Sequence, residues 1–316
     1  MKKELTAADR VVKALSKDRL SFKDLRRATG LSHDALNDAI ADVRTTRKDL
    51  MFGKFDKTYW FSNTPTWYSN QTDLSKTLPL AGRIGCVSDT HRCSVAERLD
   101  VLHAAYRTFQ KLGIKHVFHC GDMTDGWFEY RGHQNFVKVH GDQPQALWAI
   151  QRYPKVEGIT TYVIGGNHDD SYHKTKIDRL SLVTHGFHDR GKEVKGRDDI
   201  VYLGQYSHYV IFPQEIRMHM LHPRGSQAYA MSYQQQKRSE NMPKNERPDI
   251  QISGHYHTYT HICLDGTHLV ALPGMQDETE FFKRLGFARS IGYTVIEYEI
   301  EKGKLVSFAP RVYMEE

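Results

Sequence analysis

RIGCVSDTH, residues 83–91, carries the pattern that decides the fold: a short apolar run that ends in an aspartate and a histidine. The run has the length of a strand and polar residues follow it at once, which predicts a buried strand. Four further runs, at residues 115–120, 159–164, 215–221 and 249–253, have the same form. The polar residues after the five runs are Asp89-Thr90-His91, Gly121-Asp122, Gly166-Asn167-His168-Asp169, His222 and Gly254-His255-Tyr256-His257. Since the strands of an α/β sheet present their carboxyl ends at one edge, we expect these residues to converge there.

The donor atoms of these residues favour particular metal ions. Carboxylate, imidazole and amide groups are present without a thiolate, and this set suits Mn²⁺, Fe²⁺ or Zn²⁺ better than Mg²⁺ or Ca²⁺, which prefer oxygen ligands. A carboxylate shared by two ions about 3.5–4 Å apart is typical of in-line displacement at phosphorus. We therefore expect two divalent metal ions, with Mn²⁺ preferred, that lower the pKa of a bridging water and so produce a hydroxide nucleophile.

The five blocks, in this order across residues 83 to about 275, resemble the calcineurin-like metallophosphoesterase superfamily, whose pattern is Asp-x-His, Gly-Asp, Gly-Asn-His-Asp/Glu, His and Gly-His-x-His. The resemblance implies an α/β fold in which two sheets form a sandwich flanked by helices. It also implies two metal sites that share one aspartate. The first metal would be held by Asp89, His91 and His257, and the second by Asn167, His222 and His255, with Asp122 bridging the two.

The resemblance further implies which residues are catalytic. His168 is the expected outer-sphere histidine that stabilises the transition state or protonates the leaving oxygen, and Asp169 is expected to orient its imidazole. His219 competes with His222 as a ligand because both lie on one expected strand. We favour His222, which stands beside a proline at the strand exit. The remaining histidines, His133 among them, are expected to be structural or solvated groups.

Several residues near the blocks are candidates for contact with the substrate. Arg92 is a candidate phosphate contact, with a structural salt bridge as the alternative. Tyr130 and Arg131 lie in a long segment after the second block, where they could stack on a base and bind a phosphate, or simply pack. Arg224 follows the fourth block and is expected near the phosphate. Asp125 either tunes a metal ligand from outside the ligand set or caps a turn.

Residues 4–62 have the pattern of a winged helix-turn-helix module. Apolar residues at helical spacing predict helices over 7–18, 22–29 and 33–46, with Ser21 and Ser32 as N-caps and Gly30 at the end of the second helix. Alternating residues in DLMFGKF and KTYWFS predict a β-hairpin around Asp56-Lys57. We expect residues 63–80 to form a linker and residues 81–316 to form the metallophosphoesterase domain.

The expected third helix of this module does not have the charge of a helix that reads DNA bases. Its exposed face includes Asp34, Asp38 and Asp42, and these carboxylates would repel DNA phosphates. The cations that we expect to grip the DNA backbone lie at the helix end and in the hairpin, and they are Arg44, Arg47, Lys48, Lys54 and Lys57. Such contacts give docking without base readout. The alternative is a module for protein docking or dimerisation.

The composition is compatible with a nucleic-acid partner and gives no membrane signal. The 316 residues carry a formal net charge of +6, which permits binding to a polyanion. No apolar stretch approaches 18 residues, so no membrane span is expected. The opening residues MKKELTAADRVVKAL lack the apolar centre of a signal peptide. Four scattered cysteines are expected to be reduced thiols, so we expect a cytoplasmic protein.

The block sequences favour one branch of the superfamily. They fit the SbcD-like repair nucleases and related phosphodiesterases better than the protein serine/threonine phosphatases, whose third block ends in glutamate where this chain has Asp169. We therefore expect a DNA nuclease or phosphodiesterase that hydrolyses phosphodiester bonds. The alternative is a phosphodiesterase or phosphatase for small molecules or cyclic nucleotides, whose N-terminal module binds a protein partner or forms a homo-oligomer.

Overall fold

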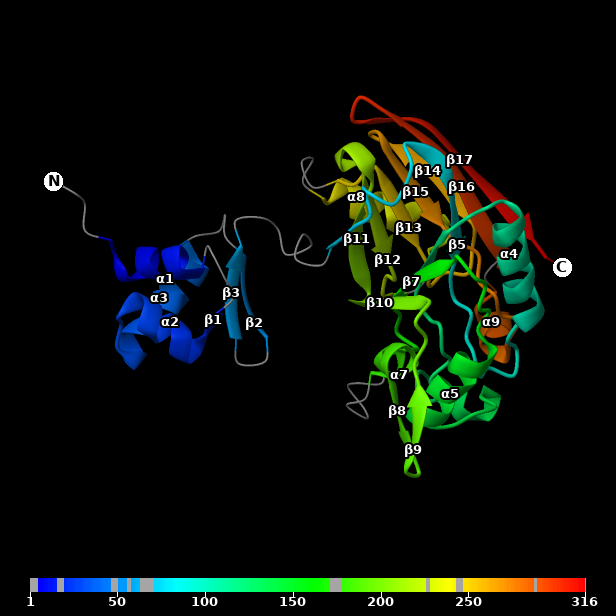
Figure 1. Cartoon of the computed structure of the whole chain (residues 1–316), viewed down its shortest axis with the longest axis horizontal. Helices are drawn as coiled ribbons and strands as arrows, with labels where there is room; N and C mark the ends of the chain where they lie inside the picture. Colours follow the sequence, from blue (N-terminus) through cyan, green and yellow to red (C-terminus); the bar gives the residue numbers. More distant parts are fainter. Residues whose placement is uncertain are drawn as a thin grey trace. The chain divides into compact units, whose positions relative to one another are not determined.

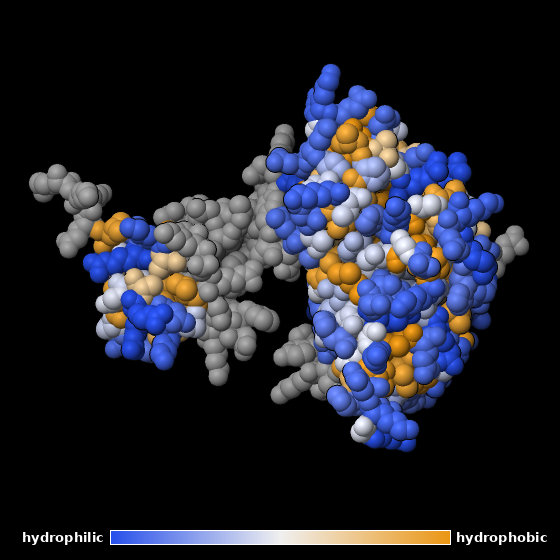
Figure 2. Space-filling model, in the orientation of Figure 1, coloured by the Kyte–Doolittle hydropathy of each residue, from blue (hydrophilic) through white to orange (hydrophobic). Residues whose placement is uncertain are grey.

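The computed structural model describes residues 5–15, 20–46, 51–55, 58–62, 71–170, 178–225, 228–242, 247–286 and 289–315. The chain divides into two compact units, residues 1–69 and 70–316 (Figure 1). Hydrophilic and apolar residues are interspersed on the face of unit 2 that Figure 2 shows. Within the described ranges, none of the helices has both the length and the apolar character needed to cross a membrane.

Unit 1 contains three helices and a small sheet. Its elements are α1 (Ala7–Leu15), β1 (Leu20–Ser21), α2 (Phe22–Thr29), α3 (His33–Thr46), β2 (Met51–Phe55) and β3 (Thr58–Ser62). The strands pair antiparallel in the order β1-β3-β2. The expected helices and hairpin strands are therefore present. The expected turn at Asp56-Lys57, and residues 16–18 of the expected first helix, lie outside the described residues.

Local capping explains where α2 begins and ends. The Ser21 hydroxyl accepts a hydrogen bond from the Asp24 N–H at 3.2 Å, which satisfies one of the free donors of the first turn. Gly30 has φ 69°, the left-handed region that favours glycine, and its N–H bonds to the Arg26 carbonyl at 3.0 Å. The helices enclose an apolar core of Val11, Leu25, Leu36, Ala39, Ile40 and Val43.

The first sheet of unit 2 has the strand order β10-β7-β6-β5-β16-β17. Its strands are β5 (Ala81–Val87), β6 (His116–Cys120), β7 (Thr160–Gly165), β10 (Ile200–Gln205), β16 (Gly292–Glu301) and β17 (Lys304–Met314). The first four of these strands run parallel, and β16 and β17 add antiparallel strands beyond β5. The helices α4 (Leu99–Lys111), α5 (Asp142–Arg152) and α7 (Arg179–His185) lie in the crossovers between the parallel strands.

The second sheet of unit 2 has the strand order β14-β15-β13-β12-β11-β4. Its strands are β4 (Gln71–Asp73), β11 (Ser207–Ile211), β12 (Arg217–Leu221), β13 (Ile250–Ser253), β14 (Thr260–Leu264) and β15 (Thr267–Ala271). Strands β12, β13 and β15 are parallel. Strand β4 lies within the expected linker, yet it pairs with β11, and Leu74 and Leu78 are buried after it. The linker expected over 63–80 therefore does not extend through residues 71–80.

The shorter elements of unit 2 connect the strands of the two sheets. They are the 3₁₀ helices η2 (His133–Phe136) and η3 (Pro213–Glu215), the hairpin of β8 (Gly186–Asp189) and β9 (Lys192–Lys195), α8 (Tyr233–Glu240) and α9 (Glu280–Leu285).

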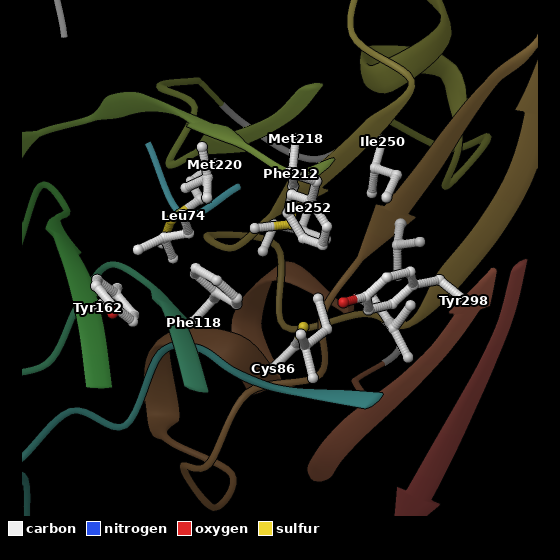
Figure 3. Close-up of a cluster of buried hydrophobic side chains, with 14 of the residues drawn as sticks. Leu74, Cys86, Phe118, Tyr162, Phe212, Met218, Met220, Ile250, Ile252 and Tyr298 are labelled. Atoms are coloured by element: carbon white, nitrogen blue, oxygen red, sulfur yellow. The ribbon is translucent and has the colours of Figure 1, made fainter. Parts of the chain in front are cut away.

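The core of unit 2 lies on both faces of the first sheet. Figure 3 shows Met218, Met220 and Ile252 of the second sheet facing Cys86 and Phe118 of the first. The alternate residues of the first sheet, such as Val87 and Val117, point the other way and pack with the helices. Because both faces are covered, these strands are apolar without alternation, which is the pattern that the sequence shows. The expected sandwich of two sheets flanked by helices is confirmed.

We expect Phe118→Ala to destabilise unit 2 by about 3–5 kcal/mol, because it removes a fully buried ring and leaves a cavity. Phe118 packs against Tyr162 with ring centroids 5.4 Å apart and against Phe212 at 6.5 Å. Denaturant unfolding, with hydrogen exchange of β6 and β12 peptides to separate unit 2 from unit 1, measures the effect. Phe118→Leu keeps most of the volume and serves as the control. A loss below about 1 kcal/mol in the alanine variant would contradict this account of the core.

Candidate metal centre

The residues after five strands come together at one edge of the sandwich. Strands β5, β6 and β7 are parallel neighbours in the first sheet, and β12 and β13 are parallel neighbours in the second. Side chains from both sheets form groups in which the donor atoms lie within 4.8 Å of one another. The first sheet supplies Asp89, His91, Asp122 and Asn167, and the second supplies His222, His255 and His257. The convergence expected from the sequence is thus present.

The first group consists of Asp89, His91 and His257, which are all buried. His257 Nε2 lies 3.4 Å from Asp89 Oδ1 and 3.1 Å from His91 Nε2. The two imidazole nitrogens therefore face each other, and at this distance they share either one proton or one cation. This group contains the three residues expected to hold the first metal.

The second group consists of Asp122, His222 and His255. His222 Nε2 lies 3.2 Å from Asp122 Oδ2 and 3.2 Å from Asn167 Oδ1. The same Asp122 oxygen lies 3.8 Å from His91 Nε2 in the first group. One carboxylate oxygen therefore stands near a donor atom of each group, which is the position that a bridging ligand requires.

The structure distinguishes the two histidines that compete as a ligand, which are His219 in β12 and His222 directly after β12. His222 belongs to the second group, whereas the His219 ring stacks on Tyr209 with centroids 4.4 Å apart. His219 Nε2 lies 2.8 Å from the Ser207 hydroxyl, a partner on the neighbouring strand. Of the two candidates, His222 is the one placed among the other candidate ligands.

The backbone at the strand ends adopts the left-handed conformation. The φ angles are 51° at Asp89, 41° at His91, 52° at Asp122, 79° at His255 and 50° at His257. Aspartate and histidine occupy this region more readily than most residues, but it is still unusual outside glycine. Such conformations concentrate at functional sites, where the surrounding structure determines them. Here the turns aim five candidate ligands into one space.

Two glycines of the blocks are required by close approach. A Cβ atom at Gly166 would collide with the Asp122 carboxylate and the His222 ring. A Cβ atom at Gly254 would collide with the Asp89 carboxylate and the Ser88 hydroxyl. The glycines that begin the third and the fifth block therefore leave the room that the candidate ligands occupy.

Hydrogen bonds to the outer nitrogens fix the orientation of three imidazoles. His91 Nδ1 donates to Asp125 Oδ1 at 2.8 Å, and His222 Nδ1 donates to the Cys120 carbonyl at 2.7 Å. His255 Nε2 donates to the Gly225 carbonyl at 2.7 Å. Each bond places the proton of the neutral ring on the outer nitrogen and leaves the other nitrogen with a lone pair for a metal ion. Of the two roles open to Asp125, orienting a candidate ligand is the one that the structure shows.

His168 lies beside the two groups and is also held by Asp125. Its Nδ1 donates to the Asp125 backbone carbonyl at 2.6 Å and lies 3.5 Å from Asp125 Oδ1. Burial alone would lower the pKa of His168, but the Asp122 and Asp125 carboxylates outweigh it and raise that pKa to about 10. The side chain is 15% exposed, so Nε2 remains the nitrogen that a substrate can meet.

The expected role of Asp169 is wrong. Its carboxylate accepts hydrogen bonds from the N–H groups of Gly166, Met123 and Thr124 at 3.0, 3.0 and 2.8 Å, and from the Thr124 hydroxyl at 2.8 Å. These hydrogen bonds occupy both oxygens of the Asp169 carboxylate. Asp169 therefore joins the turns after β6 and β7, whereas Asp125 orients the His168 imidazole.

The expected contact of Arg92 with phosphate is also wrong, and the salt-bridge alternative is correct. Arg92 is completely buried, and its guanidinium lies 3.1 Å from the Glu97 carboxylate. A side chain without exposed surface cannot reach a substrate. Nothing in the local sequence distinguishes a buried arginine from an exposed one at this position.

Arg179 is a residue of the site that sequence reasoning missed. It is completely buried on α7, donates to the Gln145 side chain at 2.9 Å and also donates to the His168 carbonyl. It therefore holds the backbone of the third block, although it lies in no block itself. No spacing signal singles it out, because its partners come from α5 and from the turn after β7.

The remaining expected substrate contacts lie near the surface. Arg224 is 64% exposed, and its guanidinium lies 4.6 Å above the Tyr206 ring and 2.6 Å from the Tyr206 hydroxyl. Arg131 is exposed, whereas Tyr130 is partly buried with its ring stacked on His133 at 4.5 Å.

Two of the expected DNA contacts, Arg44 and Lys54, lie in α3 and β2 but have undescribed side chains. The other three, Arg47, Lys48 and Lys57, lie outside the described residues.

The donor set fits divalent metal ions. The two groups combine carboxylates with imidazoles whose outer nitrogens are already bonded, and they include no thiolate. Burial would raise the pKa of Asp122, but the neighbouring His222 and His168 lower it well below its usual range, so the carboxylate is ionised. Ionised carboxylates together with imidazole side chains suit Mn²⁺, Fe²⁺ and Zn²⁺.

Comparison with solved structures finds chains that match over nearly their whole length, at low identity. The chain is similar to an archaeal phosphodiesterase, with 15% identity and a TM-score of 0.38, over 73% of this chain and 99% of that one. It is similar to a predicted phosphoesterase from Streptococcus pneumoniae TIGR4, with 16% identity and a TM-score of 0.35, over 73% and 98%. Vacuolar protein sorting 29 from Cryptosporidium parvum has 10% identity and a TM-score of 0.37, over 74% and 99%. No curated protein matches the chain.

The family assignment rests on a different comparison. The model of the calcineurin-like phosphoesterase superfamily domain matches residues 83–290. This range begins in β5, ends before β16 and contains all the residues of the two groups. The chain therefore belongs to the calcineurin-like phosphoesterase superfamily.

Proposed function

We propose that the protein is a nuclease or phosphodiesterase of the SbcD-like branch that hydrolyses phosphodiester bonds of DNA with two divalent metal ions, Mn²⁺ preferred. The observation that carries the proposal is the Asp122 oxygen that lies near both donor groups, with the partly exposed His168 beside it. In this proposal the ligands are those expected from the sequence, namely Asp89, His91, Asp122, Asn167, His222, His255 and His257. Bound divalent ions would lower the pKa of water to supply the nucleophile and would offset the charge on the phosphoryl oxygens.

The protein's own residues complete the chemistry. His168 is held through Nδ1, so Nε2 is the atom that donates a proton to the leaving oxygen. The pKa of about 10 keeps the imidazole protonated at neutral pH in the protein without ions, and a cation beside Asp122 would bring that pKa closer to neutrality. A protonated imidazole is the form that a general acid needs.

Exposed groups beside the centre support contact with an extended phosphodiester. Arg224 lies two residues after His222, and stacking on Tyr206 limits its motion. Its guanidinium can bind a phosphate with two parallel hydrogen bonds. Arg131 is a second candidate for a phosphate, and Tyr130 a candidate for stacking on a base.

The role of unit 1 in this proposal is that of a winged-helix anchor for the DNA backbone. Asp34, Asp38 and Asp42 of α3 are exposed, which disfavours base readout by that helix. Backbone contacts would instead come from Arg44, Arg47, Lys48, Lys54 and Lys57. The exposed cations of α2, which are Lys23, Arg26 and Arg27, extend the basic character of unit 1.

The acidic face of α3 supports a second candidate function. A helix with three exposed carboxylates is suited to a basic protein surface, so unit 1 could bind a protein partner or a second copy of the chain. The metal centre would then act on a small-molecule or cyclic phosphodiester. Direct comparison of the two substrate classes separates the two functions.

We expect His168→Ala to lower kcat by roughly 10²–10⁴ on phosphodiester substrates, because it removes the proposed general acid. The metal content should remain unchanged, since His168 is not among the proposed ligands. Hydrolysis of bis-p-nitrophenyl phosphate and elemental analysis measure the two quantities. His188→Ala, which removes an exposed histidine of β8, is the matched control. A His168→Ala variant with wild-type kcat would exclude the assigned role.

We expect metal affinity to increase with pH up to about 9. Burial would lower the pKa of His222, but Asp122 and its hydrogen bond raise that pKa to about 9, so the ring is protonated at neutral pH without metal. A metal ion needs the neutral ring and must displace the proton. Calorimetry of Mn²⁺ binding in two buffers of different ionisation enthalpy reports the protons released. Affinity independent of pH, with no proton release, would contradict this arrangement.

We expect DNA affinity to fall linearly on logarithmic axes as salt increases, with a slope of about −0.9 for each phosphate contacted. The full chain is tested on linear, circular, nicked and single-stranded DNA with Mn²⁺. His168→Ala should bind with the same slope but cleave much more slowly, and a Lys54→Ala, Lys57→Ala double variant should have a shallower slope. Turnover of bis-p-nitrophenyl phosphate with DNA intact and unbound would favour the small-molecule function instead.

A further inference from the structure

We propose that His133 is a positioning residue of the metal centre, which holds the Asp125 carboxylate in the orientation that serves both His91 and His168. His133 is the first residue of η2 and lies in none of the five sequence blocks. The catalytic consequence rests on the proposed function, whereas the positioning itself does not. From the sequence, His133 is expected to be a structural or solvated histidine, whereas its contacts point to a more specific role.

The two ring nitrogens of His133 have different partners, and this fixes the tautomer. The side chain is 1% exposed. The Glu129 N–H donates to His133 Nδ1 at 3.2 Å, so Nδ1 is an acceptor and the proton of the neutral ring is on Nε2. Nε2 lies 3.3 Å from Asp125 Oδ2 and therefore donates to it. Burial lowers the pKa of His133, which favours the neutral ring.

The two oxygens of the Asp125 carboxylate have different partners. Oδ1 lies 2.8 Å from His91 Nδ1 and 3.5 Å from His168 Nδ1, so one oxygen faces both the candidate ligand and the proposed acid. Oδ2 receives the His133 bond. Rotation of the carboxylate out of its present plane would turn Oδ1 away from His91 and His168 and would break these contacts. A donor fixed on Oδ2 prevents the rotation, and His133 provides that donor.

The His133 ring also fills the space beside His168. It stacks on Tyr130 with centroids 4.5 Å apart and an interplanar angle of 27°. It meets the His168 ring at 5.1 Å and 85°, an edge-to-face contact. The ring therefore limits the movement of the His168 imidazole by packing as well as through Asp125.

Hydrogen bonds to backbone groups on either side of His133 anchor the segment that carries it. The Gln145 side chain accepts from the Gly126 N–H at 3.1 Å and donates to the Gly126 and Val139 carbonyls at 2.9 and 2.8 Å. The Lys138 N–H donates to the Cys93 carbonyl at 2.7 Å. The position of His133 is thus set by the fold before a substrate arrives, as positioning requires.

The test uses three variants of the full chain. His133→Phe keeps a ring for packing but has no donor to Asp125. His133→Gln places an amide N–H where Nε2 lies, and His133→Asn places its amide where Nδ1 lies, too far from Asp125. Comparison of Gln with Asn isolates the bond to Asp125, and it decides the question even where the Phe variant does not fold.

The first measurement needs no activity. In metal-free protein, ¹H–¹⁵N spectra of the histidine rings should show His133 as the Nε2–H tautomer. The Nδ1 signals of His91 and His168 should shift in the Phe and Asn variants and return to wild-type positions in the Gln variant. Unchanged His91 and His168 signals in the Asn variant would overturn the proposal.

The second measurement uses aryl phosphodiesters with leaving groups of increasing basicity and Mn²⁺ present. Loss of such a supporting partner should lower kcat by roughly 10–100-fold in the Phe and Asn variants, with KM unchanged. The loss should grow as the leaving group becomes more basic, because a basic leaving group depends more on the acid. The Gln variant should recover most of the rate, and equal losses in Gln and Asn would overturn the proposal. Wild-type protein inert toward every diester would refute the proposed function, and the spectra would still decide the role of His133.

Discussion

Burial of two carboxylates, Asp89 and Asp122, at the same edge of the sandwich is the constraint on which the rest of the site depends. Both are at most 1% exposed, and a buried ionised carboxylate is unfavourable unless cations or several donors compensate it. Groups that follow strands of the second sheet provide that compensation, with the His255 N–H and the His257 ring beside Asp89 and the His222 ring beside Asp122. The same attraction joins the two sheets at this edge. Divalent ions would compensate the charges more strongly, so the electrostatics of the fold and those of the proposed chemistry have one origin.

The backbone conformation of the site follows from how firmly the strands are held. Left-handed residues at Asp89 and Asp122 cost stability, and they persist only where the surroundings determine them. The strands that precede them are buried on both faces, between the second sheet and the helices. Asp169 adds a local restraint, since its carboxylate binds backbone N–H groups in the turns that follow β6 and β7. A rigid core thus allows strained turns at its edge.

The sequence predicts the parts of this structure that depend on residue type and strand order. Apolar runs that end in metal-type residues predict the strands and the meeting of their carboxyl ends, because parallel strands leave few alternatives. The sequence does not predict which partner a given side chain binds. Asp169 binds backbone N–H groups, and Arg92 binds Glu97 in the interior, although each stands within two residues of a candidate ligand in the sequence. Strand β4 escaped prediction because three residues carry no periodic pattern.

The residues that the sequence could not reveal share one property, which is that they act on His168 from segments outside the blocks. Arg179 holds its carbonyl from α7, and His133 reaches Asp125 from η2. With Nδ1 bonded to the Asp125 carbonyl, the backbone and one ring nitrogen of His168 are both restrained. Only Nε2 is left to meet a substrate. The blocks therefore supply the reactive groups, and the segments between the blocks hold the His168 imidazole in position. Neither Arg179 nor His133 belongs to a motif, so the spacing of the motifs could not predict this restraint.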